Sequence, residues 1–396
     1  MKKDKILVVL FLVVIFGVFI SLPIKLVLVE LGLLETSNDN WVTYQEITEN
    51  NALDKLENII GKVKNGVENR VTNYFPFYSN FNKMYQDFNY NSNKLVYNDI
   101  PLKTNSDGEY IFLDKNNGFY YLTTKYKKPE LDKRMKKQIK FFNELDNEGI
   151  DISIYIPTRY ELTKLKKNNL NSYIDTFKNN LNKDIKVSVM NIDSISKYKE
   201  YFYLTDHHWT IKGALDGYYS IAKMLNVPVI ENLEVFNNEE RKYYGSMAKM
   251  ILNDSIYDYI SDVKIDLNYK VLVNGKSSDN IFKPRKIRLD RDYKFYDYYV
   301  QYFNGQYENV IYYYNQKDKD NLLILSDSYA WQIDYLIASH FNKTHVINLR
   351  YDEYQNNTFD IKSYMKENNI DKVLFLYEGG SILFDQYDYD FEGRVK

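Results

Sequence analysis

Apolar residues in the second half of the chain follow two alternating patterns, one helical and one strand-like. The first helical pattern consists of Met135, Ile139, Phe142 and Leu145. Residues 152–156 then form a short apolar run after Gly149, and glycine commonly ends a helix. The two patterns predict an amphipathic helix followed by a buried strand.

The same alternation continues to the C-terminus. Thr210 precedes one of the later helical patterns as an N-cap, because its side-chain oxygen can accept a hydrogen bond from a free backbone N–H. Helices that alternate with short apolar strands indicate an α/β fold, with a mostly parallel sheet and helices on both of its faces. The further helices are predicted near residues 173–181, 211–225, 330–339 and 360–368, and the further strands at residues 187–190, 322–325, 346–349 and 373–377.

Two other regions depart from this alternation. Residues 232–320 contain Tyr-rich and charged segments that indicate a β-rich insertion, and residues 293–303 followed by Asn304-Gly305 are typical of a hairpin. Residues 31–130 are polar and rich in Asn, and we interpret them as a stalk or N-terminal region with some strand. The main domain is therefore predicted to cover residues 131–396, including the insertion.

The N-terminus carries the pattern of a membrane anchor. Lys2, Lys3 and Lys5 precede an apolar run at residues 6–24 that is long enough to span a bilayer. The first Ala of the chain is Ala52, so a small-residue cleavage site is missing and we expect an uncleaved anchor over residues 1–30. With the basic residues inside, the protein is expected in the cell membrane with a single span and with its main domain outside the cytoplasm.

Composition narrows the classes of partner and chemistry. The 396 residues carry 52 Lys and Arg against 54 Asp and Glu, so no global positive field attracts nucleic acid, and none is expected as a partner. The absence of Cys excludes disulfides, a thiolate nucleophile and a Cys-ligated zinc site.

Candidate chemistry concentrates in the sequence Thr205-Asp206-His207-His208-Trp209-Thr210, which holds two of the four histidines of the chain. An Asp and a His two positions apart can share a hydrogen bond that orients the imidazole as a general base. From adjacency alone, either His207 or His208 could be that base.

A candidate nucleophile follows the predicted strand at residues 322–325, within Ser326-Asp327-Ser328-Tyr329-Ala330. Ligands of parallel sheets bind outside the carboxyl ends of the strands, and the free N–H groups of a following helix favour a developing oxyanion. A serine at this turn could equally be the N-cap of that helix. The Asp206-x-His208 pattern favours the nucleophile.

The two motifs together resemble the DHHW-motif family, which is related to the alginate O-acetyltransferases of the SGNH-hydrolase-like superfamily. The resemblance covers residues 133–396 and implies an SGNH-like catalytic domain. In that family pattern Asp206 and His208 are the acid and the base of a triad and Ser328 is the nucleophile. The order, with acid and base before the nucleophile, agrees with the O-acetyltransferase branch. The residues that carry the resemblance are Asp206-His207-His208-Trp209-Thr210, Gly213-Ala214 and Ser326-Asp327-Ser328-Tyr329, with weaker likenesses at Ile156-Pro157, Gly245-Ser246 and Asn348-Leu349-Arg350.

The resemblance implies an enzyme that transfers acetyl groups to a cell-surface or exported polysaccharide through an acyl-enzyme on Ser328. It implies no metal and no bound cofactor. The expected partners are the polysaccharide acceptor and a membrane-bound O-acyltransferase that delivers the acyl group. Candidate substrate-binding residues are Tyr329, Trp209, Arg350 and His207, although Trp209 could instead pack under the sheet and Arg350 could pair with a carboxylate.

Three alternatives stay open at this point. The same triad with water as acceptor would make a polysaccharide acetylesterase, and a member of the fold without activity would only bind carbohydrate. Asp206, His207 and His208 could also be ligands in a metal-dependent phosphoesterase. Such sites need further Asp or His ligands, and the chain offers only two other histidines, His340 and His345.

Overall fold

The computed structural model divides the chain into two compact units, Met1–Phe88 and Asn89–Lys396. The second unit contains nearly all the residues that the structure describes. The described residues are 84, 85, 88, 91, 92, 99–104, 110–124, 126–166, 170–265, 269–277, 295, 298–303, 308–350, 359–385 and 391.

The predicted location in the cell membrane is corrected by the structure. Across the described ranges, no helix has both the length and the apolar character that crossing a bilayer demands. Residues 6–24, which carried that prediction, lie outside the described residues.

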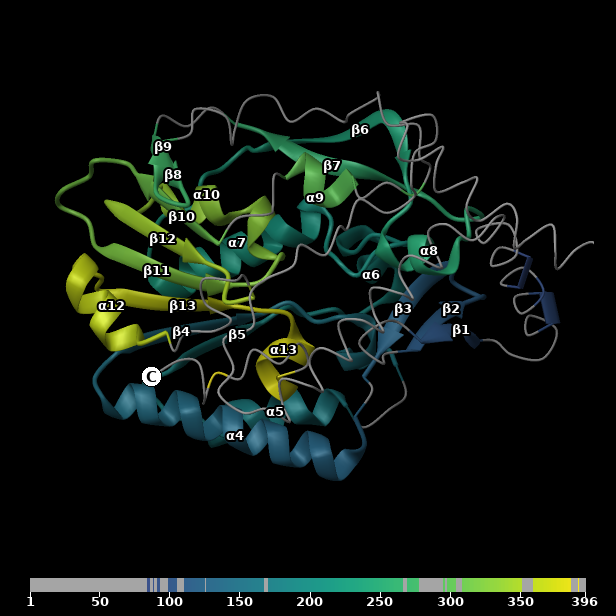
Figure 1. Ribbon diagram of the computed structural model, residues 1–396, viewed down its shortest axis with the longest axis horizontal. Coiled ribbons are helices and arrows are strands. Elements are labelled where there is room, and N and C mark those ends of the chain that lie inside the picture. Colours follow the sequence, from purple (N-terminus) through teal and green to yellow (C-terminus); the bar gives the residue numbers. More distant parts are fainter. Residues whose placement is uncertain are drawn as a thin grey trace, which may run out of the picture. The chain divides into compact units, whose positions relative to one another are not determined.

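A mixed eight-stranded sheet forms the centre of the second unit, in the order β5-β4-β13-β11-β12-β10-β8-β9 (Figure 1). The first five strands in this order are parallel to one another and the last three are antiparallel additions. The predicted α/β class with a multi-stranded sheet is therefore confirmed. The strands are β4 (Asp151–Ile156), β5 (Lys186–Val189), β8 (Lys270–Val273), β9 (Lys276–Ser277), β10 (Asn309–Tyr313), β11 (Asn321–Ser326), β12 (Lys343–Ile347) and β13 (Lys372–Leu376).

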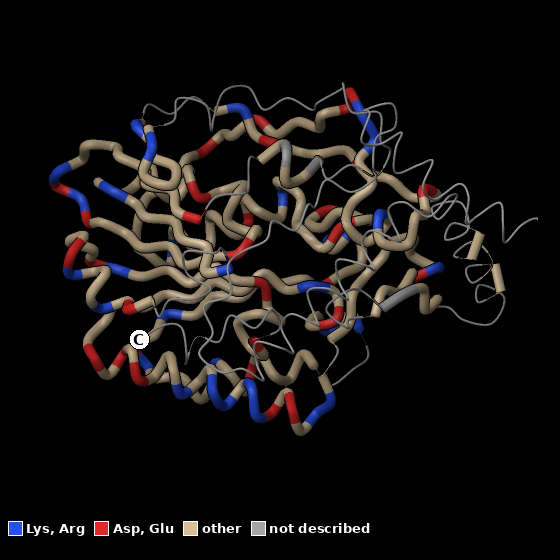
Figure 2. Tube along the Cα trace, viewed as in Figure 1, with Lys and Arg blue, Asp and Glu red and all other residues tan. Residues whose placement is uncertain are grey.

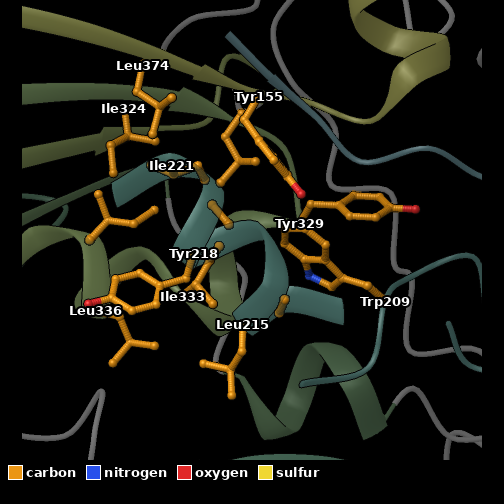
Figure 3. Close-up of a cluster of buried hydrophobic side chains, with 14 of the residues drawn as sticks. Tyr155, Trp209, Leu215, Tyr218, Ile221, Ile324, Tyr329, Ile333, Leu336 and Leu374 are labelled. Carbon is orange, nitrogen blue, oxygen red and sulfur yellow. The ribbon is translucent and has the colours of Figure 1, made fainter. Parts of the chain in front are cut away.

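Helices cover both faces of this sheet (Figure 1). One face carries α7 (Ile211–Leu225) and α10 (Asp334–Ala338), and the other carries α4 (Lys128–Asn147), α5 (Asn171–Asn180), α12 (Ile361–Asn368) and α13 (Gly379–Phe384). Alternate residues of a strand point to opposite faces. On β11, Leu322 and Ile324 accordingly enter the core under α7, part of which is drawn in Figure 3, and Leu323 and Leu325 enter the core under α4.

Charged side chains lie mainly outside the sheet. Figure 2 shows basic and acidic residues interspersed along α4, while the strands of the central sheet carry few. The buried positions of α4 include Met135, Phe142 and Leu145, as the helical spacing predicts. The exposed side of this helix is therefore charged and its inner side packs on the sheet.

Local signals explain where helices begin and end. Thr210 caps α7 as predicted, because its side chain accepts a hydrogen bond from the N–H of Gly213. The single helix predicted over residues 330–339 is wrong in one respect: it is split into a short 3-10 turn, η2 (Ala330–Gln332), and α10. The carboxylate of Asp334 accepts from the next backbone N–H, at 2.7 Å, which competes with a continuous helix.

Segments outside the α/β alternation surround the carboxyl ends of the parallel strands. β6 (Glu234–Tyr243) and β7 (Asp258–Lys264) form a two-stranded sheet joined through α8 (Ser246–Ile251). The hairpin predicted at residues 293–303 is wrong where the structure describes them, because Tyr298–Tyr302 form the helix α9. Further toward the N-terminus, β1 (Asp99–Thr104), β2 (Tyr110–Asp114) and β3 (Phe119–Thr123) form an antiparallel sheet that packs on α8.

Candidate active site

A closed loop between α6 (Ile195–Tyr201) and α7 presents the two adjacent histidines. Phe202 and Trp209 form an isolated antiparallel bridge across the base of this loop. On one side the carboxylate of Asp258 accepts hydrogen bonds from the N–H of Leu204, at 2.9 Å, and from the N–H and hydroxyl of Thr205, at 2.9 and 2.6 Å. Burial raises the pKa of Asp258 to about 6 despite these three bonds. The loop is thus held in one conformation by its own backbone and by β7.

Asp206, His208 and Ser328 lie in a hydrogen-bonding series. The Nδ1 atom of His208 is 2.6 Å from Oδ1 of Asp206, and its Nε2 atom is 2.7 Å from Oγ of Ser328. An ionised carboxylate can only accept hydrogen bonds, so Nδ1 carries the proton and Nε2 is left to accept from the Ser328 hydroxyl. All three residues are at most 6% exposed. This is the geometry in which an imidazole can take the proton of a serine nucleophile.

Asp206 is ionised because its surroundings favour the charge. Oδ1 also accepts from the N–H of His208 at 2.9 Å, and Oδ2 accepts from the Tyr243 hydroxyl at 2.7 Å and the Ser246 N–H at 2.6 Å. Burial alone would raise the pKa of Asp206, but the His208 and His207 rings and the hydrogen bonds lower it well below its usual range. The carboxylate therefore stays charged, which fixes the tautomer of His208.

Gly245 allows the chain to approach Asp206 this closely. A Cβ atom at this position would lie 2.4 Å from Cβ of Asp206 and 2.6 Å from the backbone oxygen of Thr205, which no real Cβ tolerates. The requirement comes from close approach and not from backbone angles, since the φ of Gly245 is −66°. Gly245 thus lets Ser246 place its N–H on the carboxylate.

Ser328 lies in the turn that directly follows β11, at the carboxyl edge of the sheet. The neighbouring Asp327 carboxylate accepts from the N–H of Tyr329 at 3.0 Å and from the N–H of Glu378 at 2.9 Å. The first bond closes the turn that carries Ser328, and the second joins this turn to the end of the adjacent strand β13. Burial raises the pKa of Asp327, although Arg350 and these hydrogen bonds oppose the shift.

Aromatic side chains support the imidazole of His208 from one side. The Tyr299 ring of α9 stacks on it with centroids 3.9 Å apart and planes inclined by 13°, and the Trp331 ring lies near both, 5.9 Å from the Tyr299 centroid and 6.4 Å from that of His208. The Tyr299 hydroxyl donates to the backbone oxygen of Ser328 at 3.3 Å.

Sequence reasoning missed Tyr299 because one Tyr among 40 carries no local signal. The only sequence signal for Tyr243 and Ser246 was the weak likeness to the family at Gly245-Ser246.

His207 lies beside the base but has different partners. Its Nδ1 atom is 2.9 Å from Oγ of Ser246, and its ring centroid is 4.0 Å from that of His208. Burial, together with the adjacent His208 ring, lowers the pKa of His207 to about 3, so its ring is neutral near pH 7. Its side chain is 23% exposed, which keeps it available as a candidate substrate contact.

The two aromatic substrate-binding candidates, Trp209 and Tyr329, are both buried in the structure. Trp209 is completely buried against Tyr329 and Tyr155, so it has no open face on which a sugar could stack (Figure 3). Tyr329 is 1% exposed and its hydroxyl donates to the backbone oxygen of His207. Both residues thus shape the loop. Arg350, half-buried after β12, donates to Asn348 Oδ1 and stays a predicted substrate contact.

Asp206, His207 and His208 are close enough together to hold a metal ion, with ligand atoms within 4.8 Å of one another. Both ring nitrogens of His208 are however engaged, one by Asp206 and the other by Ser328. A metal bound to His208 would have to displace one of these contacts. The donor set therefore suits proton transfer better than metal binding.

The α/β sheet, with Ser328, His208 and Asp206 gathered at its carboxyl edge, is similar in fold to solved structures of other proteins. Bacillus cereus PatB1 with a sulfonyl adduct is 17% identical, with a TM-score of 0.56 over 72% of this chain and 98% of that chain. A DHHW family protein from Eubacterium siraeum is also 17% identical, with a TM-score of 0.56 over 74% of this chain and 97% of that chain.

These likenesses show a common fold and confirm, at that level, the resemblance to the DHHW-motif family. The O-acetyltransferase domain of Pseudomonas putida AlgJ is a weaker neighbour, 10% identical with a TM-score of 0.39 over 67% of this chain and 89% of that chain. No protein-family model and no curated protein matches the chain.

Proposed function

We propose that this protein is an acyl-transfer enzyme that acetylates the hydroxyl groups of a polysaccharide through an acyl-enzyme on Ser328. The observation that carries the proposal is the unbroken series from Asp206 Oδ1 through both nitrogens of His208 to Ser328 Oγ. The fold shared with a DHHW family protein supports it.

In the first half-reaction Oγ of Ser328 attacks the carbonyl carbon of an acetyl donor while Nε2 of His208 takes the serine proton. The imidazolium that forms is stabilised by the charged Asp206. When the tetrahedral intermediate collapses, the bond to the donor oxygen breaks and that oxygen receives the proton from His208. Ser328 then carries the acetyl ester.

In the second half-reaction a sugar hydroxyl attacks the acetyl carbon and gives its proton to Nε2 of His208. The bond to Ser328 Oγ breaks, and the serine regains a proton from the imidazolium. Water in place of the sugar would complete the same cycle as an acetylesterase. The partly exposed His207 and the half-buried Arg350 are the candidates for holding the acceptor. The neutral His207 ring would favour hydroxyl groups of the acceptor, and the cationic Arg350 would favour acidic substituents.

A test of the nucleophile uses the purified protein with an activated acetyl ester. We expect Ser328→Ala to abolish acetate release and a sulfonyl fluoride to inactivate the wild type by reacting with Ser328. Ser326→Ala, the same substitution two residues earlier, should leave the rate unchanged, and a chelator should have no effect. Activity that survives in Ser328→Ala but is lost with the chelator would instead support a metal site at Asp206, His207 and His208.

Adding a polysaccharide acceptor distinguishes acetyl transfer from hydrolysis. A polysaccharide fragment added to the trapped acetyl-enzyme should speed its decay and appear acetylated, whereas an esterase would release only acetate. In cells, deletion of the gene should lower the acetyl content of the target glycan, and a rise would identify a deacetylase.

The partners stay predictions. The acceptor is expected to be a polysaccharide. The resemblance implies that a membrane-bound O-acyltransferase loads Ser328. Co-purification of such a protein, and loss of acetylation when it is deleted, would support a two-component system.

A further inference from the structure

Three charged side chains are buried at the carboxyl ends of β4 and β13, close to the serine turn. Nη2 of Arg159 is 3.0 Å from Oε1 of Glu161, and its Nε atom is 2.7 Å from Oε1 of Glu378. Arg159 is 3% exposed and each glutamate 1%. Taking charges out of water is costly, so a buried cluster of this kind is weak evidence for stability and invites a search for another role.

Each glutamate of this cluster holds a different part of the backbone. Oε2 of Glu161 accepts from the N–H of Thr124, at 2.6 Å, which follows β3. Glu378 donates its own N–H to Asp327 at 2.9 Å. The adjacent N–H of Gly379 donates to the oxygen of Pro157 at 3.0 Å, which joins the ends of β13 and β4. Arg159 therefore links the end of the three-stranded sheet, through Glu161, with Glu378, whose N–H bonds to Asp327 in the serine turn.

We propose that Arg159 is a positioning residue for Ser328 that acts through Glu378 and Asp327. Its guanidinium fixes the Glu378 side chain, and the Glu378 N–H then holds Asp327. The Asp327 carboxylate also accepts from Tyr329 and so spans the turn on which Ser328 lies. A planar guanidinium can hold two carboxylates in separate directions, which an ammonium does less well. This inference rests on the proposed function, because it concerns the serine that the proposal makes the nucleophile.

The primary test compares Arg159→Lys with the wild type in two assays: the turnover of an activated acetyl ester and the rate of inactivation by phenylmethylsulfonyl fluoride. Both report how Ser328 faces His208. Misplacement of a reacting group by about 1 Å can cost about 100-fold, so we expect both rates to fall by roughly 10- to 100-fold with KM little changed. A thermal melt of the same samples verifies that the variant is folded.

A double-mutant cycle separates positioning from a general structural role. Asp327→Asn should slow the same two reactions, and Arg159→Lys combined with Asp327→Asn should be no slower than Asp327→Asn alone, because both changes act on one path. Lys186→Met, which breaks an ion pair with Asp151 at the opposite edge of the sheet, is the matched control and should react like the wild type.

Arg159→Lys reacting at the wild-type rate, or effects of the two substitutions that multiply, would overturn the inference. If Arg159→Lys does not fold, Glu378→Gln decides, since it keeps the backbone bond to Asp327 and weakens only the ion pair: slower reaction supports positioning and an unchanged rate refutes it. A wild type without Ser328-dependent chemistry would refute the proposed function itself, which is a different result.

Discussion

Asp206 lies in the loop between α6 and α7, and Asp258, the first residue of β7, bonds to the same loop, but the pKa values of the two carboxyls are shifted in opposite directions. Asp206 accepts four hydrogen bonds and lies beside two histidine rings, so the pKa of its carboxyl is well below the usual range. Asp258 accepts three bonds, yet burial and the nearby charge of Asp206 raise the pKa of its carboxyl to about 6. The first is suited to orient a base, and the second to hold a loop.

Asp206→Asn tests the orienting role. An amide has one acceptor oxygen where the carboxylate satisfies four donors, and its NH₂ group favours the wrong tautomer of His208. We expect turnover to fall by about 10³- to 10⁴-fold. The free energy of unfolding should fall by about 1–3 kcal/mol, because buried donors lose their partner. Asp360→Asn, at the N-cap of α12, removes the same charge away from the site and should leave turnover unaffected.

Asp258→Asn tests a pH effect of definite sign. A carboxyl whose pKa is raised by folding binds its proton more tightly in the folded state. Its contribution to stability is therefore present below about pH 4 and is lost as pH rises through about 6. The Asp258 side chain is only partly shielded from water. We therefore expect the free energy of unfolding of the wild type to fall by about 1–2 kcal/mol across this window, and we expect Asp258→Asn to show no such fall. Denaturant unfolding at several pH values measures it, and identical pH profiles for the two proteins would contradict the shift.

At the scale of elements, the site depends on segments that carry none of Asp206, His208 and Ser328. Tyr243, which ends β6, and Ser246, which begins α8, supply two of the four hydrogen bonds to Asp206. α9 supplies the ring that stacks on His208. Both residues and α9 lie in the region predicted as an insertion, so this region forms one wall of the site.

Gly245→Ala tests how tightly that wall fits. The added methyl group would meet Asp206 and the backbone of Thr205 below 3 Å, and backbone cannot move as cheaply as a flexible side chain. We expect Asp206 to be displaced and turnover to fall by at least about 10-fold. Gly275→Ala in the β8–β9 turn is the control: its φ of +73° makes it strained, but no atom lies within 4 Å of the new methyl group. It should lower the melting temperature and leave turnover unchanged.

At the scale of the whole molecule, the three-stranded sheet is part of the support of the site. The N–H of Tyr120 donates to the oxygen of Leu204 just before Asp206, at 2.8 Å. Residues of β1, β2 and β3 share a core with Met247 and Ile251 of α8. Thr124 is tied to Glu161 of the buried ion cluster. The sheet thus contacts both the loop that carries Asp206 and the ion cluster next to the Ser328 turn.

Shortening the chain tests this support. A protein of residues 131–396 matches the predicted main domain but lacks the sheet, so the apolar side of α8 is exposed and the bonds to Leu204 and Glu161 are lost. We expect it to melt at a lower temperature and to be inactive. A protein that begins at Asn89, where the second unit starts, keeps the sheet and should be active. Equal activity of the two proteins would show that the predicted boundary at residue 131 is sufficient.

The sequence by itself determined the features that depend on neighbouring residues. Helical spacing and short apolar runs predicted the parallel strands and most of their helices, because burial on a helix or strand repeats with a fixed period. Thr210 predicted a helix start because capping involves only the next three residues. The Asp206-x-His208 spacing suggested the contact that the two side chains make, since it spans a single loop.

Only the tertiary structure decided the features that join distant segments. His208, and not His207, faces Ser328 across 120 positions of the chain, and the two histidines are equivalent by adjacency alone. Trp209 turns into the core and Tyr329 bonds to the histidine loop, although both belong to the motifs. Tyr243, Ser246 and Tyr299 contact Asp206 or His208 from a region without regular alternation. Arg159, Glu161 and Glu378 meet because parallel strands bring their carboxyl ends to one edge, and no local period records which strands are neighbours.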